Sequence, residues 1–206
     1  MWGNCNVLLR ETKTSLVLAT VTVLTSCTIA YTVNGTLSDD VRIVDLATWG
    51  GVTLSDIVSG RPWRFLTAQL VHVKIPHMLF NAVSLYLVGA FVETRAGGRA
   101  VLLVWLVAGG LATLFSPVLI DPPYNVGTGA SQAVIAVGGF AAVLLRRPAW
   151  RTAYGVGVTV LATIPPFFID LAYAGYPKPG HLLALVLGVM FALIWSWRNR
   201  EKESRA

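Results

Sequence analysis

Six apolar runs, each near the length of a membrane-spanning helix, constrain the fold of this chain more than any other feature. They occupy residues 15–33, 77–92, 100–120, 131–145, 152–174 and 181–197. A helix needs roughly 20 apolar residues, at about 1.5 Å per residue, to cross the hydrocarbon core of a bilayer. With 55% hydrophobic and only 13% charged residues, the chain is too apolar for a water-exposed domain of its length. The runs predict an all-α membrane protein with six transmembrane helices.

The same runs divide the chain into three regions. We expect a cytoplasmic N-terminal segment (1–13), a membrane domain (14–197) and a basic cytoplasmic tail (198–206). Arg10 and Lys13 precede the first run as basic residues precede the core of a signal peptide. That run is about 20 residues long and lacks an obvious small-residue cleavage site, so we interpret it as a first membrane helix.

Basic residues at the ends of the runs predict the orientation. If the N-terminus is cytoplasmic and the runs alternate in direction, only five of the 16 Lys and Arg residues fall outside and eleven fall inside. The five are Arg42, Arg61, Arg64, Lys74 and Lys178. Because cytoplasmic loops carry the excess of Lys and Arg, we expect a multi-pass protein of the cell membrane with both termini in the cytoplasm.

Composition argues against several other classes of protein. A net charge of +6 is compatible with nucleic-acid binding, but the basic residues punctuate apolar runs and do not form one basic, aromatic-rich face. Cys5 and Cys27 form no CxxC pattern, and neither cysteine nor carboxylate accompanies the histidines at the spacing of a metal site. We therefore expect two free thiols, no metal or other cofactor, and no nucleic-acid partner.

The fourth run is short and follows a stretch that cannot be helical. Residues 122–131 read Pro-Pro-Tyr-Asn-Val-Gly-Thr-Gly-Ala-Ser, which is loop chemistry. A helix over residues 131–145 would cover only about 22 Å of a core roughly 30 Å thick, so its start must lie below the outer surface. Non-helical backbone at that depth must be buried in protein or line a water-filled cavity. The sequence therefore predicts a hydrated pocket, open to the outside, with Ser131 at the helix N-terminus.

Four polar residues are candidates for chemistry in this pocket. Free N–H groups at the start of a helix would stabilise negative charge that develops at Ser131. His181 opens the sixth run and is the candidate base, while His77 and Asn81 project from one face of the second run as candidate oxyanion donors. Each has a purely structural alternative: Ser131 as a helix cap, His181 as an interfacial histidine, and His77 with Asn81 as a hydrogen-bonded link between helices.

Several motifs together resemble the rhomboid family of intramembrane serine proteases. The segment His72-Val-Lys-Ile-Pro-His77-Met-Leu-Phe-Asn81 resembles the family's His, His and Asn pattern. Gly129-Ala130-Ser131 matches the first three places of its Gly-x-Ser-Gly. The remaining similarities are Trp63-Arg64 in the long first loop, Gly89 to Arg95 after the second helix, and His181 with Ala184 and Gly188 on the sixth. The resemblance covers roughly residues 14–197.

This resemblance implies a six-transmembrane-helix rhomboid-like bundle and an intramembrane endopeptidase. It implies a Ser-His dyad without an Asp, in which His181 takes the proton of Ser131, while His77 and Asn81 with the backbone N–H of Ser131 hold the oxyanion. The substrates would be single-pass transmembrane proteins, cut near the outer membrane face. A pocket below that face suits a substrate helix whose upper part is locally unstable and rich in Gly or Ala.

Other residues of the motifs would have supporting roles. By the same resemblance, Trp63-Arg64 would anchor the interfacial loop and His72 would support the site. Small residues would allow the fourth and sixth helices to approach closely. They are Ala133 and Gly138 on one helix and Ala184 and Gly188 on the other.

Three departures from the family pattern leave alternatives open. Gln132 stands where the family has Gly, Ile135 where many members carry an aromatic that stacks on the catalytic His, and Ala184 where the family has Gly. Gln132 could narrow the pocket or donate a hydrogen bond into it, so the alternative is a catalytically inactive rhomboid-like protein that binds transmembrane helices. A transporter or channel is a weaker alternative, because only Asp170 could lie at mid-membrane depth, and we expect it near the outer surface.

Overall fold

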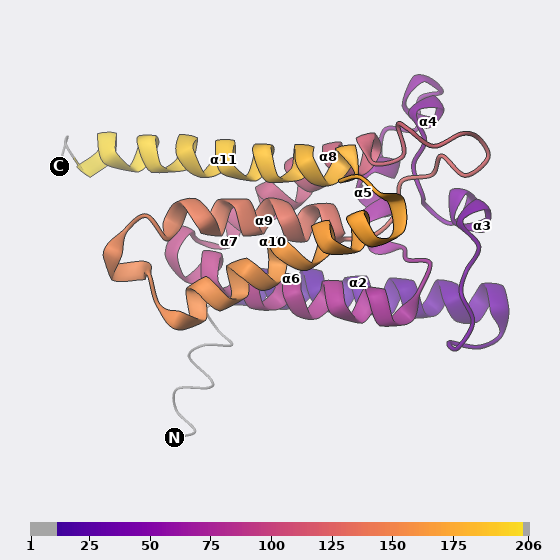
Figure 1. Cartoon of the computed structure of the whole chain (residues 1–206), viewed down its shortest axis with the longest axis horizontal. Coiled ribbons are helices and arrows are strands. Elements are labelled where there is room, and N and C mark those ends of the chain that lie inside the picture. The colour runs from indigo at the N-terminus through magenta and orange to yellow at the C-terminus, as the bar shows by residue number, and fades with distance from the viewer. Residues whose placement is uncertain (1–11, 204–206) are drawn as a thin grey trace.

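The computed structural model describes residues 12–203 and shows a bundle of apolar helices (Figure 1). Five helical segments are long and apolar enough to cross a membrane, and a sixth apolar helix, α9 (Ser131–Leu144), is shorter. The five are α2 (Lys13–Asn34), α6 (Ile75–Ala96), the continuous segment Gly98–Phe115, α10 (Ala153–Ala174) and α11 (Pro179–Glu203). The protein is therefore a multi-pass membrane protein, helical throughout its described core.

The segment Gly98–Phe115 is irregular and ends earlier than predicted. It consists of α7 (Gly98–Leu103), a π-helical stretch η2 (Val104–Gly109) and α8 (Gly110–Phe115). The sequence pattern placed its end at residue 120, but Pro117 has no N–H with which to continue the helix. The chain instead turns away into the loop that leads to α9.

Helix α9 lies at the centre of the bundle. Twelve of its 14 residues are buried, and it packs against α6, α10, α11 and η2 (Figure 1). At about 1.5 Å per residue it is only about 21 Å long, so it is too short to span a bilayer core of roughly 30 Å. The residues directly before Ser131, Gly129 and Ala130, are buried in protein, whereas the start of the same loop, residues 121–124, is exposed.

Close contact between α9 and α11 depends on small residues, although not on all of those predicted. A Cβ atom on Gly188 would collide with the backbone of Ala136, and one on Gly139 would lie 2.8 Å from the carbonyl oxygen of Leu185. The prediction for Gly138 is wrong. Gly138 faces Ala162 and Thr163 of α10, and Ala133 faces Gly109 of η2. Neighbouring helix positions point about 100° apart, and the rotation of α9 selects Gly139 for this contact.

The first loop folds into short helices at the end of the bundle where α9 begins (Figure 1). They are α3 (Ile43–Thr48), α4 (Leu54–Val58), α5 (Arg64–Thr67) and the 3₁₀ turn η1 (Ala68–Leu70). The guanidinium of Arg64 donates to the carbonyl oxygens of Ala47 and Gly51 and lies 3.6 Å from the Asp56 carboxylate. Trp63 is 55% exposed. Arg64 therefore holds the loop from inside, while Trp63 faces outward.

At the opposite end of the bundle, Glu93 connects α6 to the start of α2. Its buried carboxylate accepts hydrogen bonds from the backbone N–H groups of Thr14 and Ser15, at 2.9 and 2.8 Å, and from the Ser15 hydroxyl at 2.6 Å. The first N–H groups of a helix have no partner within the helix, so Glu93 supplies the missing acceptor.

The terminal regions are described only in part. Cys27 is a free thiol on α2, whereas Cys5 and Arg10 lie outside the described residues. Helix α11 continues to Glu203, so the predicted tail, residues 198–206, begins as an extension of that helix.

Candidate active site

The loop before Ser131 is held by the first loop of the chain. Gly129 has a φ of +93°, in the left-handed region that favours glycine. Its N–H donates to the carbonyl oxygen of Ala68 at 2.8 Å, and the N–H of Ala130 donates to Nε2 of His72 at 3.0 Å. These bonds fix the backbone just before the nucleophile candidate and place Ser131 at the first position of α9.

His72 is a buried, neutral link between three parts of the chain. Because Nε2 accepts from Ala130, the ring proton belongs on Nδ1, which lies 3.0 Å from the hydroxyl of Ser26 on α2. That hydroxyl in turn donates to the carbonyl oxygen of Leu70 at 2.7 Å. Burial lowers the pKa of His72 to about 3, which keeps the ring uncharged at neutral pH. This is the supporting position that the family resemblance implied.

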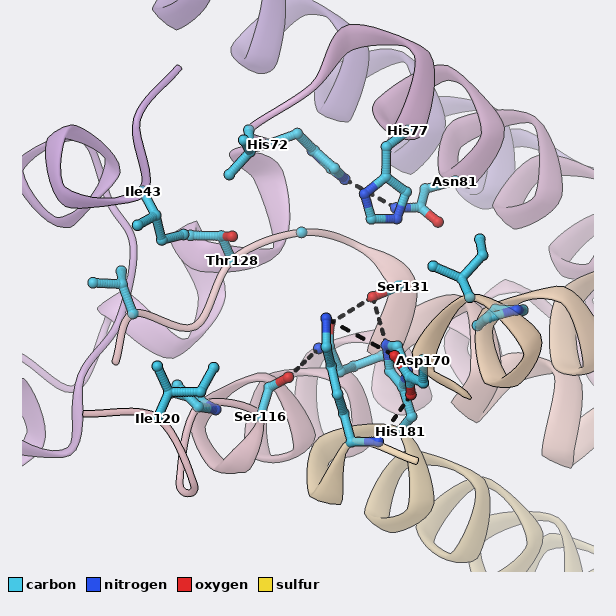
Figure 2. Close-up of a pocket in the computed structure, with 18 of the residues that line it drawn as sticks. Ile43, His72, His77, Asn81, Ser116, Ile120, Thr128, Ser131, Asp170 and His181 are labelled. Atoms are coloured by element: carbon cyan, nitrogen blue, oxygen red, sulfur yellow. Dashed lines mark hydrogen bonds and ion pairs between the residues drawn. The ribbon is translucent and has the colours of Figure 1, made fainter. Parts of the chain in front are cut away.

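Ser131 and His181 lie side by side at the starts of α9 and α11. The Ser131 Oγ is 3.0 Å from Nε2 of His181, within hydrogen-bond distance, and each residue is only 5% exposed (Figure 2). The backbone N–H of His181 donates to the carbonyl oxygen of Lys178, which fixes the first turn of α11. The two residues predicted as nucleophile and base are therefore in direct contact.

The other face of His181 is occupied by α10, which sequence reasoning missed. Nδ1 of His181 lies 2.6 Å from Oδ2 of Asp170, whose side chain is fully buried. The ring of Phe167, one helical turn earlier, meets the His181 ring edge-on with 6.2 Å between centroids. The sequence analysis placed Asp170 near the outer surface but did not connect it with His181, which its buried carboxylate contacts. The available signal was a carboxylate in an apolar run eleven residues before His181.

His77 and Asn81 face the same pocket from α6. A cavity of about 230 Å³ is lined by both of them and by Ser131, Asp170 and His181. Figure 2 shows them across the pocket from Ser131. The Asn81 Nδ2 lies 3.2 Å from Nε2 of His72. The backbone nitrogen of Ala130 donates to the same lone pair from a shorter distance, 3.0 Å. The Asn81 Oδ1 has no hydrogen-bond partner. The amide of Asn81 is thus loosely held at the edge of the cavity.

Gln132 is buried beside the nucleophile candidate. Its Oε1 lies 3.1 Å from the hydroxyl of Ser131, and its Nε2 donates to the hydroxyl of Ser116 at 2.9 Å. Gln132 therefore does not block the space between Ser131 and His181. It offers the Ser131 hydroxyl a second acceptor besides His181.

The histidines are not arranged as a metal site. Within residues 12–203, we find no group of three or more His, Cys, Asp or Glu side chains that could hold a metal ion. The rings of His72 and His77 lie edge to face with 5.9 Å between their centroids. The polar side chains that line the cavity carry amide, imidazole, hydroxyl, carboxylate and ammonium groups.

Comparison with known proteins identifies the family of this chain. Residues 59–198 match the model of the rhomboid domain family. The chain is also 31% identical over 150 residues to rhomboid protease GluP of Bacillus subtilis (strain 168). That alignment covers 71% of this chain but 29% of GluP, so the chain spans less than a third of the length of this relative. The family match takes in most of the chain, including the segments that carry His72, Ser131 and His181. The chain belongs to the rhomboid family.

Proposed function

We propose that this protein is an intramembrane serine endopeptidase in which Ser131 is the nucleophile and His181 is the general base. The observation that carries the proposal is the 3.0 Å contact between the Ser131 Oγ and Nε2 of His181 at the wall of a cavity that several polar side chains line. A weak hydroxyl nucleophile needs an adjacent base within this distance. Membership of the rhomboid family supports the same chemistry.

The reaction is acyl transfer. The Ser131 Oγ attacks the carbonyl carbon of the scissile peptide bond while its proton passes to Nε2 of His181. The tetrahedral intermediate collapses as the C–N bond breaks and His181 gives that proton to the departing amine. Water then attacks the acyl-enzyme, with His181 again as base, and restores the Ser131 hydroxyl.

The oxyanion would be held from two sides. We assign the backbone N–H of Ser131 as one donor, because it lies in the first turn of α9 where such groups have no partner within the helix. His77 and Asn81 would donate from α6 across the cavity. The loose hydrogen bond between Asn81 and His72 leaves its amide able to turn toward a substrate oxygen.

We further propose that six helices cross the membrane, with α9 recessed, and that both termini are cytoplasmic. Substrates would be single-pass transmembrane proteins, cut near the outer face of the cell membrane. A recessed start of α9 favours substrates whose helices unwind easily in that region, because a peptide carbonyl must leave its helix to reach Ser131.

The test uses the full chain in detergent and in liposomes with a transmembrane reporter. We expect cleavage by the wild type and loss of cleavage, at least on the order of 10³-fold, in Ser131→Ala and in His181→Ala. Ser38→Ala, which removes an exposed hydroxyl in the first loop, is the matched control and should cleave normally. Cleavage that persists in Ser131→Ala would sink the proposal, once contaminating proteases are removed.

Gln132, which stands where the family has Gly, motivates the alternative function: a catalytically inactive protein that binds transmembrane helices. A fluorophosphonate probe separates the two functions because it labels only an activated serine. We expect labelling of Ser131 in the wild type and none in Ser131→Ala. A well-folded wild type that binds the reporter but remains unlabelled would favour the binder.

A further inference from the structure

The ring of His181 lies between α9 and α10 and contacts a different polar residue on each. Its Nε2 points toward Ser131 on α9, and its Nδ1 points toward Asp170 on α10 (Figure 2). A Ser-His dyad, which the family pattern implies, leaves Nδ1 without a carboxylate. Here α10 supplies one at 2.6 Å, which is the short distance of a charge-assisted hydrogen bond.

The Asp170 carboxylate is buried and has few partners. Its side chain has no exposed surface. Oδ2 accepts the backbone N–H of Lys178 at 2.9 Å in addition to the contact with Nδ1, whereas Oδ1 has no hydrogen-bond partner and lies 3.8 Å from the Lys178 ammonium. A buried carboxylate is costly unless it is paired. The imidazole of His181 is its closest partner, and the carboxylate stabilises a positive charge on that ring.

The contact also decides which tautomer His181 adopts. A carboxylate accepts hydrogen bonds, so the ring proton lies on Nδ1 and the free lone pair lies on Nε2. That lone pair then faces the Ser131 hydroxyl. Phe167 packs edge-on against the same ring. The contact supplies from α10 the aromatic neighbour that Ile135 does not provide from α9.

We propose that Asp170 is a positioning residue that completes a Ser131, His181 and Asp170 triad in this protein. The inference rests on the proposed function, because it concerns the base of that reaction. When the Ser131 proton passes to Nε2, the Nδ1 proton stays on His181 and is shared with Asp170 through their hydrogen bond. Nε2 later gives its proton to the leaving amine, and the carboxylate is unchanged at the end of the cycle.

The principal experiment compares Asp170→Asn with the wild type at equal amounts of folded protein. The amide has the same shape but no charge, and it can hold the wrong tautomer of His181. We expect kcat on the reporter to fall on the order of 10²-fold or more at pH 7, while KM changes less than about threefold. Asp45→Asn, which removes a carboxylate from the exposed pair with Arg42 in the first loop, is the matched control and should leave kcat unchanged.

The pH profile separates a positioning role from a purely structural one. The charged and titratable groups around His181 are Asp170 and Lys178 at the α10–α11 turn and His77 from α6, and no residue of α9 is ionisable. Without the carboxylate, Lys178 is the dominant neighbour and disfavours a charged ring. The acidic limb of kcat/KM in Asp170→Asn should therefore move to lower pH. A variant with unchanged kcat and an unmoved acidic limb would overturn the inference.

A measurement on the wild type keeps the inference testable if Asp170→Asn does not fold. The chain has three histidines, so ¹⁵N-histidine labelling gives three rings, which His72→Gln and His77→Gln assign. We expect His181 to carry its proton on Nδ1 at neutral pH, with that proton shifted far downfield. A proton on Nε2 would contradict the triad. If Ser131 is neither labelled nor needed for cleavage, the proposed function fails and the triad fails with it. If the wild type is active and folded Asp170→Asn cleaves the reporter at the same rate, only the triad is overturned.

Discussion

At the scale of single residues, the site depends on which nitrogen of each histidine carries a proton. His72 accepts at Nε2 from Ala130, and His181 presents Nε2 to Ser131. Both arrangements place a proton on Nδ1, with Ser26 as the partner in one case and Asp170 in the other. The two rings are similar in protonation but differ in setting, because one faces a hydroxyl and the other a carboxylate.

The setting of His72 predicts a pH-dependent stability. Burial lowers its pKa from 6.5 to about 3 in the folded protein. Between these values the unfolded chain binds a proton that the folded chain does not, so stability falls as the pH falls, by up to about 1.4 kcal/mol per pH unit. We expect the thermal midpoint in detergent to fall more steeply below about pH 6.5 in the wild type than in His72→Gln. Parallel curves for the two proteins would contradict this role of His72.

Gln132 predicts a small gain of activity when its oxygen is removed. The Ser131 hydroxyl has one proton and two acceptors at similar distances, His181 and Gln132. If the conformers are equally populated, about half of the hydroxyls point away from the base, and removing the competitor gains about twofold. Gln132→Met keeps the bulk without the acceptor, and we expect fluorophosphonate labelling of Ser131 to speed up by about this factor. A loss of more than tenfold would instead make the Gln132 amide part of the catalytic machinery.

The candidate residues were predictable from the sequence, except for the partner of His181. Ser131, His181, His77 and Asn81 could be named because motif spacing and helix periodicity place them at the same end of the bundle. Asp170 could not be assigned in the same way, because its contact with His181 depends on the rotation of α10 and on the turn before α11. Phe167 was missed for the same reason. Neither the rotation of α10 nor the shape of that turn is encoded in the spacing of residues along one helix.

At the scale of helices, hydropathy predicted well where helices begin and end along the sequence, but it predicted poorly which helices their residues contact. The predicted run at residues 152–174 differs from α10 by one residue at its start, and the fourth run differs from α9 by one residue at its end. Length and polarity determine such limits. The end of α8 and the partner of Gly138 were predicted wrongly, because both depend on three-dimensional neighbours.

The contact of Gly188 with α9 predicts a loss of stability on a minimal substitution. The extra methyl group of Gly188→Ala would collide with the backbone of Ala136, which cannot move aside as a flexible side chain can. We expect the free energy of unfolding to fall by about 1–3 kcal/mol and Ser131 labelling to slow, because α9 and α11 carry the nucleophile and the base. Gly157→Ala on α10 is the control, since its Cβ would meet no atom within 4 Å. It should be neutral or slightly stabilising. Equal stability of the two variants would refute the packing argument.

At the scale of the whole molecule, the distribution of charge predicts the orientation in the membrane. Ser38 lies in the first loop, near the Ser131 end of the bundle, whereas Ala149 lies in the turn between α9 and α10 at the opposite end, and both are exposed. In a background of Cys5→Ser and Cys27→Ser, we expect a membrane-impermeant thiol reagent to label Ser38→Cys on intact cells and Ala149→Cys only after lysis. The reverse pattern would place the site on the cytoplasmic side.

The proposed recessed start of α9 predicts how the cleavage rate responds to a stiffer substrate helix. Under the proposed function, a peptide bond reaches Ser131 only after the substrate helix unwinds locally, so replacing Gly or Ala near the cut with Leu should slow cleavage. Leu substitutions at the far end of the same reporter helix are the control and should have little effect. An unchanged rate with the stiffened reporter would count against unwinding as a requirement.

The carboxylate of Glu93 has a consequence for the order in which the molecule is built. It holds the backbone of Thr14 and Ser15, which precede it by 79 and 78 residues. During synthesis α2 is made before this acceptor, so the N–H groups of Thr14 and Ser15 cannot bind Glu93 until the end of α6 has been made. We therefore expect α2 to enter the bilayer before its hydrogen bonds with Glu93 form. In nascent chains that end before Glu93, we expect α2 to lie in the bilayer at a depth that varies, because the hydrogen bonds to Glu93 are missing.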